Sequence, residues 1–204
     1  YHFNYDYKFK IINKKQFVFK FQKTEEIIRR PSLQGLHQIE NASTALTTAI
    51  ILKQNNYNIK LRSLGKSIFN TKWPGRIEKI KFKNKFLILD GSHNLSGADK
   101  LNDYLIENNI RPNVIFGMLN NKKIFEFLSI LKKNIDTLYP IKIPDQDNAY
   151  TQNEIYKISK KLKLDVVIKK NLSNINKILI NESNKYILIT GSLYLIGKIR
   201  KKYL

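Results

Sequence analysis

The sequence predicts an α/β fold, in which a mostly parallel sheet carries helices on both faces and follows a smaller region of mixed structure. Three observations support this prediction. Short apolar segments typical of strands alternate with amphipathic segments from about residue 86 to the end. Residues 86–89 and 186–190 are uninterrupted apolar runs, as expected of strands covered on both faces. A Trp-Pro-Gly break at 73–75 separates this pattern from a different one before it.

The region before the break is predicted to be a hairpin followed by two helices. Residues 5–11 and 16–21 carry aromatic and β-branched side chains in partial alternation around a polar break. A helix is expected over 37–53, because apolar residues recur there at helical spacing. Its apolar stripe consists of Ala42, Ala45, Leu46, Ala49 and Ile50. A second helix is expected over 60–70, where Asn58 can be its cap and Leu61, Leu64 and Ile68 face inward.

Beyond the break, the alternation predicts six strands and five helices. The strands are expected over 77–82, 86–90, 113–117, 135–140, 165–169 and 186–190. The helices are expected over 97–109, 121–133, 151–163, 172–181 and 193–203. Parallel strands joined by helices place their carboxyl ends at one edge of the sheet, where ligands bind in open α/β folds. We therefore expect one domain over 1–72 and a second over 74–204.

Composition restricts the classes of function. The sequence has no Cys and three His, which excludes disulfides and thiolate sites and argues against a His-rich metal site. No apolar run approaches the roughly 18 residues that cross a bilayer, so a cytoplasmic protein without a membrane partner is expected. The first residue is Tyr1 and the single Met is Met118, so we expect the chain to be a piece of a longer one.

The formal net charge of +21 is of the kind that attracts nucleic acid, nucleotides or other polyanions. Lys, Ile and Asn, which A/T-rich codons encode, supply 31, 30 and 23 residues, whereas Arg, the better phosphate ligand, supplies six. Because the lysines are scattered along the chain, drift in composition is the preferred explanation, and no specific nucleic-acid partner is expected. A basic nucleic-acid-binding module is the alternative, and it predicts salt-sensitive binding to any duplex.

Small or polar residues follow three of the predicted strands. Residues 90–94 (Asp-Gly-Ser-His-Asn) follow one strand, Gly117 follows another, and 190–192 (Thr-Gly-Ser) lead from a third directly into a helix. Asp90 can accept hydrogen bonds from both hydroxyls of a ribose, or it can cap the next helix. The free amides at the start of the last helix suit a carboxylate or a phosphate, although Ser192 can also be a plain N-cap.

Each of three further residues has two possible roles. Arg76 follows the Trp-Pro-Gly break, where its guanidinium can bind a phosphate or simply lie at the surface. Asn41 lies one turn after His37 and can pair with an adenine edge or reach solvent. His93 lies in a loop, where a lone His is more often packed than catalytic. Residues 65–67 (Gly-Lys-Ser) lack the upstream Gly of a phosphate loop, so the residues alone indicate a nucleotide- or anion-binding domain without that loop.

Five segments share their order and spacing with one known family. They are 35–42, 73–78 (Trp-Pro-Gly-Arg-Ile-Glu), 89–94 (Leu-Asp-Gly-Ser-His-Asn), 116–119 and 190–197. Together they resemble the folylpolyglutamate synthase/dihydrofolate synthase family of the Mur ligase superfamily, over nearly the whole chain from about residue 31. The resemblance implies that 1–72 is the end of the central ATPase domain and 74–204 the Rossmann-like C-terminal domain. An N-terminal half outside this sequence would carry the phosphate loop and the Mg²⁺ ligands.

The resemblance implies an ATP- and Mg²⁺-dependent, ADP-forming ligase. Such enzymes activate the carboxylate of a folate or dihydropteroate as an acyl phosphate, which the amino group of L-glutamate attacks to give an amide. The resemblance places adenine by Asn41, phosphate by Arg76 and ribose by Asp90. It places the incoming glutamate near His93 and Ser192. Without the phosphate loop, the chain is expected to be inactive alone.

The sequence departs from the family pattern in three places. Leu95 stands where members often have Pro, Ser92 where many have Ala, and residues 121–123 where acidic residues are common. A peptidoglycan-type Mur ligase would share the architecture, but such ligases tend to carry a second Asp and a Tyr in the motif around Asp90, which Gly91 and Ser92 do not match. A cyanophycin-type ligase is a more distant alternative.

Overall fold

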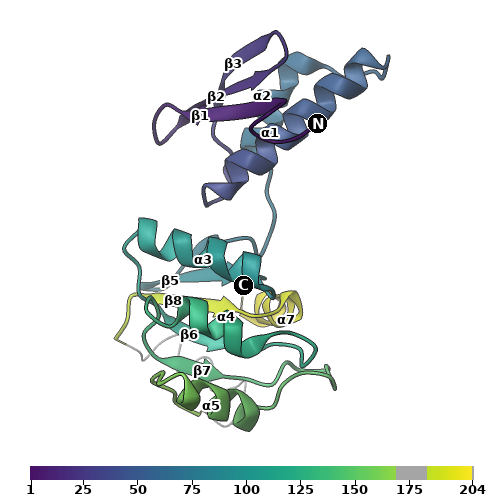
Figure 1. Ribbon diagram of the computed structural model, residues 1–204. Helices are drawn as coiled ribbons and strands as arrows, with labels where there is room; N and C mark the ends of the chain where they lie inside the picture. Colours follow the sequence, from purple (N-terminus) through teal and green to yellow (C-terminus); the bar gives the residue numbers. More distant parts are fainter. Residues whose placement is uncertain (169–182, 204) are drawn as a thin grey trace. The chain divides into compact units, whose positions relative to one another are not determined.

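The computed structural model describes residues 1–168 and 183–203 (Figure 1). The chain forms two compact units, Tyr1–Trp73 and Pro74–Leu204. Each has its own hydrophobic core. Within the described residues, no helix is long and apolar enough to cross a membrane.

The first unit packs a three-stranded antiparallel sheet against a long helix. The strands β1 (Tyr7–Ile11), β2 (Gln16–Phe21) and β3 (Thr24–Arg29) pair in sequence order. Every second residue of β2 is buried, because successive side chains of a strand point to opposite faces. The core contains Phe17, Phe19 and Phe21 of β2 and Ile39, Ala42 and Leu46 of helix α1 (His37–Gln54). The predicted hairpin is confirmed, whereas β3 was not predicted.

Helix α1 lies where it was predicted, but its buried face differs from the predicted apolar stripe. Leu46 is buried as expected, whereas Ala45 is exposed and the polar Ser43 and Thr47 are buried. The Ser43 hydroxyl donates to the carbonyl of Ile39 at 2.8 Å, and the Thr47 hydroxyl donates to the carbonyl of Ser43 at 2.9 Å. A hydroxyl that donates to a carbonyl of the preceding turn can be buried at little cost. A prediction based only on apolar residues therefore misplaces the buried face of α1.

The second predicted helix, 60–70, is two shorter elements. A 3₁₀ turn, η1 (Leu61–Ser63), precedes α2 (Leu64–Asn70), and neither begins with a side-chain cap. The prediction that Asn58 caps this helix is therefore wrong. Of the three residues predicted to face inward, Leu61 is 43% exposed, whereas Leu64 and Ile68 are partly buried and pack against the core of this unit.

The second unit is a five-stranded sheet with helices on both faces, as the sequence predicted (Figure 1). The strand order is β4-β5-β8-β6-β7, with β4 antiparallel at one edge and the other four strands parallel. The strands are β4 (Glu78–Phe82), β5 (Lys85–Asp90), β6 (Asn113–Phe116), β7 (Leu138–Pro140) and β8 (Tyr186–Thr190). The last strand, β8, lies between β5 and β6, which makes three strand ends neighbours.

The helices of this unit divide between the two faces of the sheet. Those in the described residues are α3 (Leu95–Glu107), α4 (Ile124–Leu131), α5 (Gln152–Lys161) and α7 (Leu193–Tyr203). Side chains of α3, α4 and α5 share one core cluster with the sheet, and α7 contributes to the cluster on the other face. The predicted strand 165–169 is wrong over its described part, where Val166 makes only an isolated bridge to Leu138. The predicted helix 172–181 lies outside the described residues.

Candidate functional site at the carboxyl edge of the second sheet

The loops after β5, β6 and β8 meet at one edge of the second sheet. Asp90, Thr190 and Phe116 are register partners at the carboxyl ends of these three strands. The Gly117 amide also donates to the carbonyl of Thr190 at 3.3 Å. We call residues 74–77, 90–94, 117 and 190–192 the loop edge. Such an edge is where open α/β sheets bind their ligands.

Two glycines of the loop edge are in close contact with other residues. Gly191 has φ +103°, and a Cβ there would lie 2.5 Å from the carbonyl oxygen of Gly117. A Cβ on Gly91 would lie 2.2 Å from Cδ2 of Leu193. At Gly191, backbone therefore approaches backbone closely and sterics exclude a larger residue, whereas at Gly91 the nearest atoms belong to the flexible side chain of Leu193.

The Asp90 carboxylate joins two loops. Asp90 is 2% exposed, and its Oδ2 accepts a hydrogen bond from the Ile77 amide at 3.0 Å. Its Oδ1 accepts one from the Ser92 amide, also at 3.0 Å. Asp90 does not cap the next helix, because Asn94 does so by accepting from the Gly97 amide at 2.8 Å. Each Asp90 oxygen keeps a second lone pair for a ligand.

Arg76 lies on a turn with an unusual backbone. Its neighbours Gly75 and Ile77 have φ +75° and +46°, and the latter is a strained value for a β-branched residue. Ile77 is buried, and the Gly91 amide donates to the carbonyl of Gly75 at 2.7 Å. Arg76 is half-buried and makes no hydrogen bond or ion pair with the described residues. Such strain persists where the surroundings over-determine the backbone, and it clusters at functional sites.

His93 and Ser192 are oriented by hydrogen bonds within the loop edge. His93 Nδ1 lies 2.9 Å from the carbonyl oxygen of Gly91. Because a carbonyl can only accept, Nδ1 carries the hydrogen and Nε2 of the neutral ring is left as an acceptor. Ser192 Oγ accepts from the Tyr194 amide at 3.1 Å, so the hydroxyl caps α7.

Asn41 belongs to the first unit and lies in the second turn of α1. It is exposed, and its Nδ2 donates to Oε1 of Gln38 at 3.1 Å. Gln38 Nε2 in turn lies 2.9 Å from Nε2 of His37. These three side chains are therefore linked in one polar row. Gln38 was not among the site residues predicted from the sequence. The only available signal was its spacing of three residues from Asn41.

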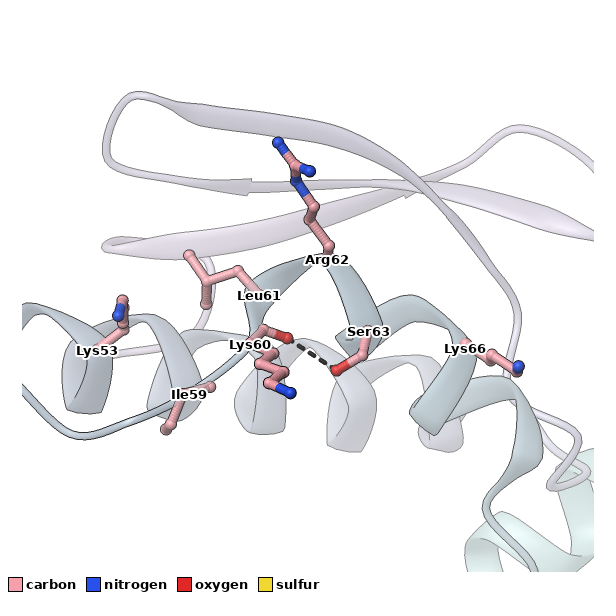
Figure 2. Close-up of a pocket in the computed structure, with 7 residues that line it drawn as sticks. All are labelled: Lys53, Ile59, Lys60, Leu61, Arg62, Ser63 and Lys66. Carbon is pink, nitrogen blue, oxygen red and sulfur yellow. Dashed lines mark hydrogen bonds between the residues drawn. The ribbon is translucent and has the colours of Figure 1, made fainter.

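A second feature of the first unit was not predicted. A hollow of about 590 Å³ is lined by Lys53, Ile59, Lys60, Leu61, Arg62, Ser63 and Lys66. We call it the basic hollow, because the sequence from 41 to 77 contains no acidic residue. Figure 2 shows the side chains of Arg62 and Lys60 pointing in different directions. A single small anion would therefore not be reached by all four cations, and none of the predicted site residues lines this hollow.

No set of three His, Asp or Glu side chains that could hold a metal ion gathers in the described residues. Asp90 is engaged with two amides, and the described acids elsewhere are dispersed. The loop edge can therefore bind hydroxyl, carboxylate or phosphate groups through its amides and side chains. It does not have the donor set that a divalent cation needs.

Comparison with known proteins decides the family. Residues 75–202, more than half of the chain, match the family described as dihydrofolate synthetase, C-terminal domain. The chain belongs to the dihydrofolate synthase family. Among curated relatives, it is 32% identical over 200 residues to dihydrofolate synthase/folylpolyglutamate synthase of Bacillus subtilis (strain 168), covering 92% of this chain and 44% of that protein. It is 28% identical over 197 residues to a probable dihydrofolate synthetase of Schizosaccharomyces pombe, covering 86% and 47%.

Solved structures agree on the fold of this dihydrofolate synthase family member. Folylpolyglutamate synthase of Thermotoga maritima has a TM-score of 0.78 at 25% identity, covering 98% of this chain and 47% of that one. E. coli FolC in complex with DHPP and ADP has a TM-score of 0.82 at 18% identity, covering 98% and 46%. A Yersinia pestis bifunctional synthase with Mn, AMPPNP and L-glutamate bound has a TM-score of 0.80 at 17% identity, covering 100% and 48%. The family resemblance predicted from the five segments is thus confirmed, and the chain spans about half the length of these relatives.

Proposed function

We propose that this chain is the C-terminal portion of an ATP-dependent ligase that joins L-glutamate to the carboxylate of a folate or dihydropteroate through an acyl phosphate. The observation that carries the proposal is the family match, because it covers the turn and the three strand ends that form the loop edge. In this proposal, 1–72 is the end of the central ATPase domain and 74–204 is the Rossmann-like C-terminal domain.

The nucleotide is assigned to Arg76, Asp90 and Asn41. The guanidinium of Arg76, which has no partner within the described chain, is available to neutralise charge that builds up on a transferring phosphoryl group. The Asp90 carboxylate keeps lone pairs for ribose hydroxyls beyond its two amide bonds. In the first unit, the exposed Asn41 amide is suited to an adenine edge. Relatives crystallised with ADP or AMPPNP support a nucleotide of this class.

The incoming L-glutamate is assigned to His93 and Ser192. The N-terminal amides of α7 favour a carboxylate, because the helix dipole is positive at that end. The Nε2 lone pair of His93 can accept a hydrogen bond from the glutamate ammonium group. The Yersinia pestis structure with L-glutamate bound supports an amino-acid site in this fold.

The proposal assigns the phosphate loop and the Mg²⁺ ligands to an N-terminal half that is not part of this chain. Bound Mg²⁺ would supply charge neutralisation on the phosphates. Within the described residues there is no acidic cluster to hold it, and the chain covers 44% of the Bacillus subtilis relative. We therefore expect the 204-residue chain alone to form no ADP.

The test compares the isolated chain with the full-length protein that carries it. ADP release is measured with ATP, L-glutamate and dihydropteroate, in the presence of Mg²⁺. The full-length protein is expected to turn over, and the chain alone is not. In the full-length protein, Arg76→Ala should cost about 2–4 kcal/mol of transition-state stabilisation. Turnover by the chain alone, or wild-type kinetics in Arg76→Ala, contradicts the proposal.

A further inference from the structure

The turn that carries Arg76 is held by a carboxylate from its own strand. Glu78, the first residue of β4, accepts a hydrogen bond at Oε2 from the Gly75 amide at 2.9 Å. Asp90 accepts the Ile77 amide from the other side of the turn. Arg76 therefore lies between two amides, each of which is bound by a different carboxylate.

Glu78 is itself held by the last helix. Nη1 of Arg200 lies 2.6 Å from Oε1 and 2.6 Å from Oε2 of Glu78. The two side chains are partly shielded, with 35% of Arg200 and 26% of Glu78 exposed. A charge-assisted contact of this kind is stronger than a neutral hydrogen bond, and partial burial reduces its screening by salt. The contact joins residues 122 positions apart, so no local pattern reveals it.

Helix α7 contacts the turn with one face over most of its length. Leu193, Ile196 and Arg200 are spaced at i, i+3 and i+7, which places them on one side of the helix. A Cβ on Gly75 would lie 3.2 Å from Ile196 and 3.5 Å from Leu193. Arg200 completes this face through Glu78. The turn is therefore packed against the same helix that begins directly after Ser192.

We propose that Arg200 is a positioning residue for Arg76. Through Glu78, it keeps the Gly75 amide bound and so keeps the Arg76 turn in its strained conformation. This inference rests on the proposed function, in which Arg76 contacts a phosphate of the nucleotide. The charge of Arg200 is already paired with Glu78, so Arg200 acts through the turn and not on the substrate.

Arg200 would act by raising the fraction of molecules in which the Arg76 turn has the conformation that binds the nucleotide. Gly75 and Ile77 adopt left-handed backbone angles that the surrounding contacts must enforce. When Arg200 is removed, the Glu78 carboxylate is free to turn toward water, and the Gly75 amide loses its acceptor. The turn then samples other conformations, and the apparent affinity for ATP falls in proportion to the competent fraction.

The kinetic test uses the full-length protein that carries this chain, with Arg200→Gln, Arg200→Lys, Arg76→Ala and the double variant Arg76→Ala/Arg200→Gln. Arg200→Gln should lower kcat/KM for ATP about tenfold, and Arg200→Lys should recover part of that loss. In the Arg76→Ala background, Arg200→Gln should cause no further loss, because a residue that acts only through Arg76 has nothing left to position.

The matched control is Lys198→Gln, on the same helix. Lys198 makes an exposed ion pair with Asp145, away from the Arg76 turn. Its replacement should leave kcat/KM unchanged. An independent readout is the hydrogen exchange of the Gly75 amide in the isolated chain. Exchange should accelerate about tenfold or more in Arg200→Gln and stay unchanged in Lys198→Gln.

The outcomes separate this inference from the function on which it rests. Wild-type kinetics in Arg76→Ala overturn the phosphate assignment of the proposed function. A loss in Arg76→Ala with unchanged kinetics in Arg200→Gln overturns only the positioning role. An equal loss from Arg200→Gln in both backgrounds also overturns it, because that additivity marks a general structural effect that does not pass through Arg76.

Discussion

The basic hollow of the first unit and the loop edge of the second unit hold their cations in opposite ways. The hollow has four cationic side chains, none with a hydrogen bond or ion pair to the described residues, and Figure 2 shows them spread in direction. The loop edge has one such cation, Arg76, on a turn fixed by Asp90, Glu78 and Gly91. This difference is the reason that we propose the loop edge, and not the hollow, as the ligand site, because a charge held in a fixed position is preorganised for a ligand.

The sharpest test of the loop edge is its backbone packing. Gly191→Ala places a Cβ 2.5 Å from the carbonyl oxygen of Gly117 at φ +103°, so the free energy of unfolding should fall by about 3 kcal/mol. Gly197→Ala is the matched control, because Gly197 lies within α7 and a Cβ there meets nothing within 4 Å. That control should gain up to about 1 kcal/mol from helix propensity. Urea unfolding of both variants measures the difference, and equal stabilities would contradict a tightly packed edge.

Asp90→Ala tests whether the Asp90 carboxylate stabilises the two loops that it joins, in addition to its proposed contact with a ribose. The change leaves the amides of Ile77 and Ser92 without their acceptor, so the free energy of unfolding should fall by about 2 kcal/mol. Thermal unfolding of the chain measures this, with nucleotide absent. A variant of wild-type stability that has lost ATP use would instead leave Asp90 with a role in ribose binding alone.

A smaller effect is expected at the start of α5, which contributes no residue to the loop edge or to the basic hollow. Thr151 caps α5 by accepting from the Glu154 amide, and the Glu154 carboxylate accepts from the Thr151 amide and hydroxyl. Thr151→Ala should cost about 1 kcal/mol of stability without changing ligand binding. Chemical denaturation measures the loss. A simultaneous loss of ATP use would contradict the expectation that the α5 cap is independent of the proposed nucleotide site.

The same cap predicts a dependence on pH. The hydrogen bonds from Thr151 lower the pKa of Glu154 below its usual range. Because the pKa is lower in the folded state, the contribution of Glu154 is complete above the pKa of the unfolded chain and is lost as the pH falls through the folded value. Glu154→Gln should therefore reduce the stability difference between neutral and acidic pH. An unchanged acid limb of the stability profile would refute this coupling.

The smallest effect is expected in the basic hollow. Lys60→Glu/Lys66→Glu reverses two of its charges, which are on side chains without partners in the described chain. In the proposed full-length ligase, turnover should stay within about twofold of wild type, because exposed charges that contact none of the proposed site residues contribute little. Steady-state kinetics measure this. A tenfold loss would reverse the comparison and make the hollow part of the substrate site.

Sequence reasoning found the elements whose apolar residues either recur with a regular period or form a continuous run. Strands β5 and β8 were predicted because each contains a continuous apolar run, 86–89 and 186–189, as is typical of central parallel strands. Strand β3 was missed because one residue, Ile28, is buried in it, while Ile27 is 64% exposed. An edge strand is fixed by its backbone pairing with β2, and that pairing has no apolar period of its own.

The predicted site residues divide in the same way. Small and polar residues after apolar runs marked Asp90, His93 and Ser192 as candidates, because strand ends at one edge of a parallel sheet are where ligands bind. Their partners were not predictable. The Ile77 amide is 13 residues from Asp90, and no side-chain pattern marks a backbone donor.

The sequence by itself determined the class of fold, the alternation of strands and helices in the second unit, and the family motifs, because each depends on residues close together in the chain. Tertiary structure alone decided that β8 inserts between β5 and β6, that Asp90 binds the turn of Arg76, and that Arg200 binds Glu78. These contacts join segments up to 122 residues apart. Their geometry exists only once the sheet has brought the segments together, so no local period in the sequence records them.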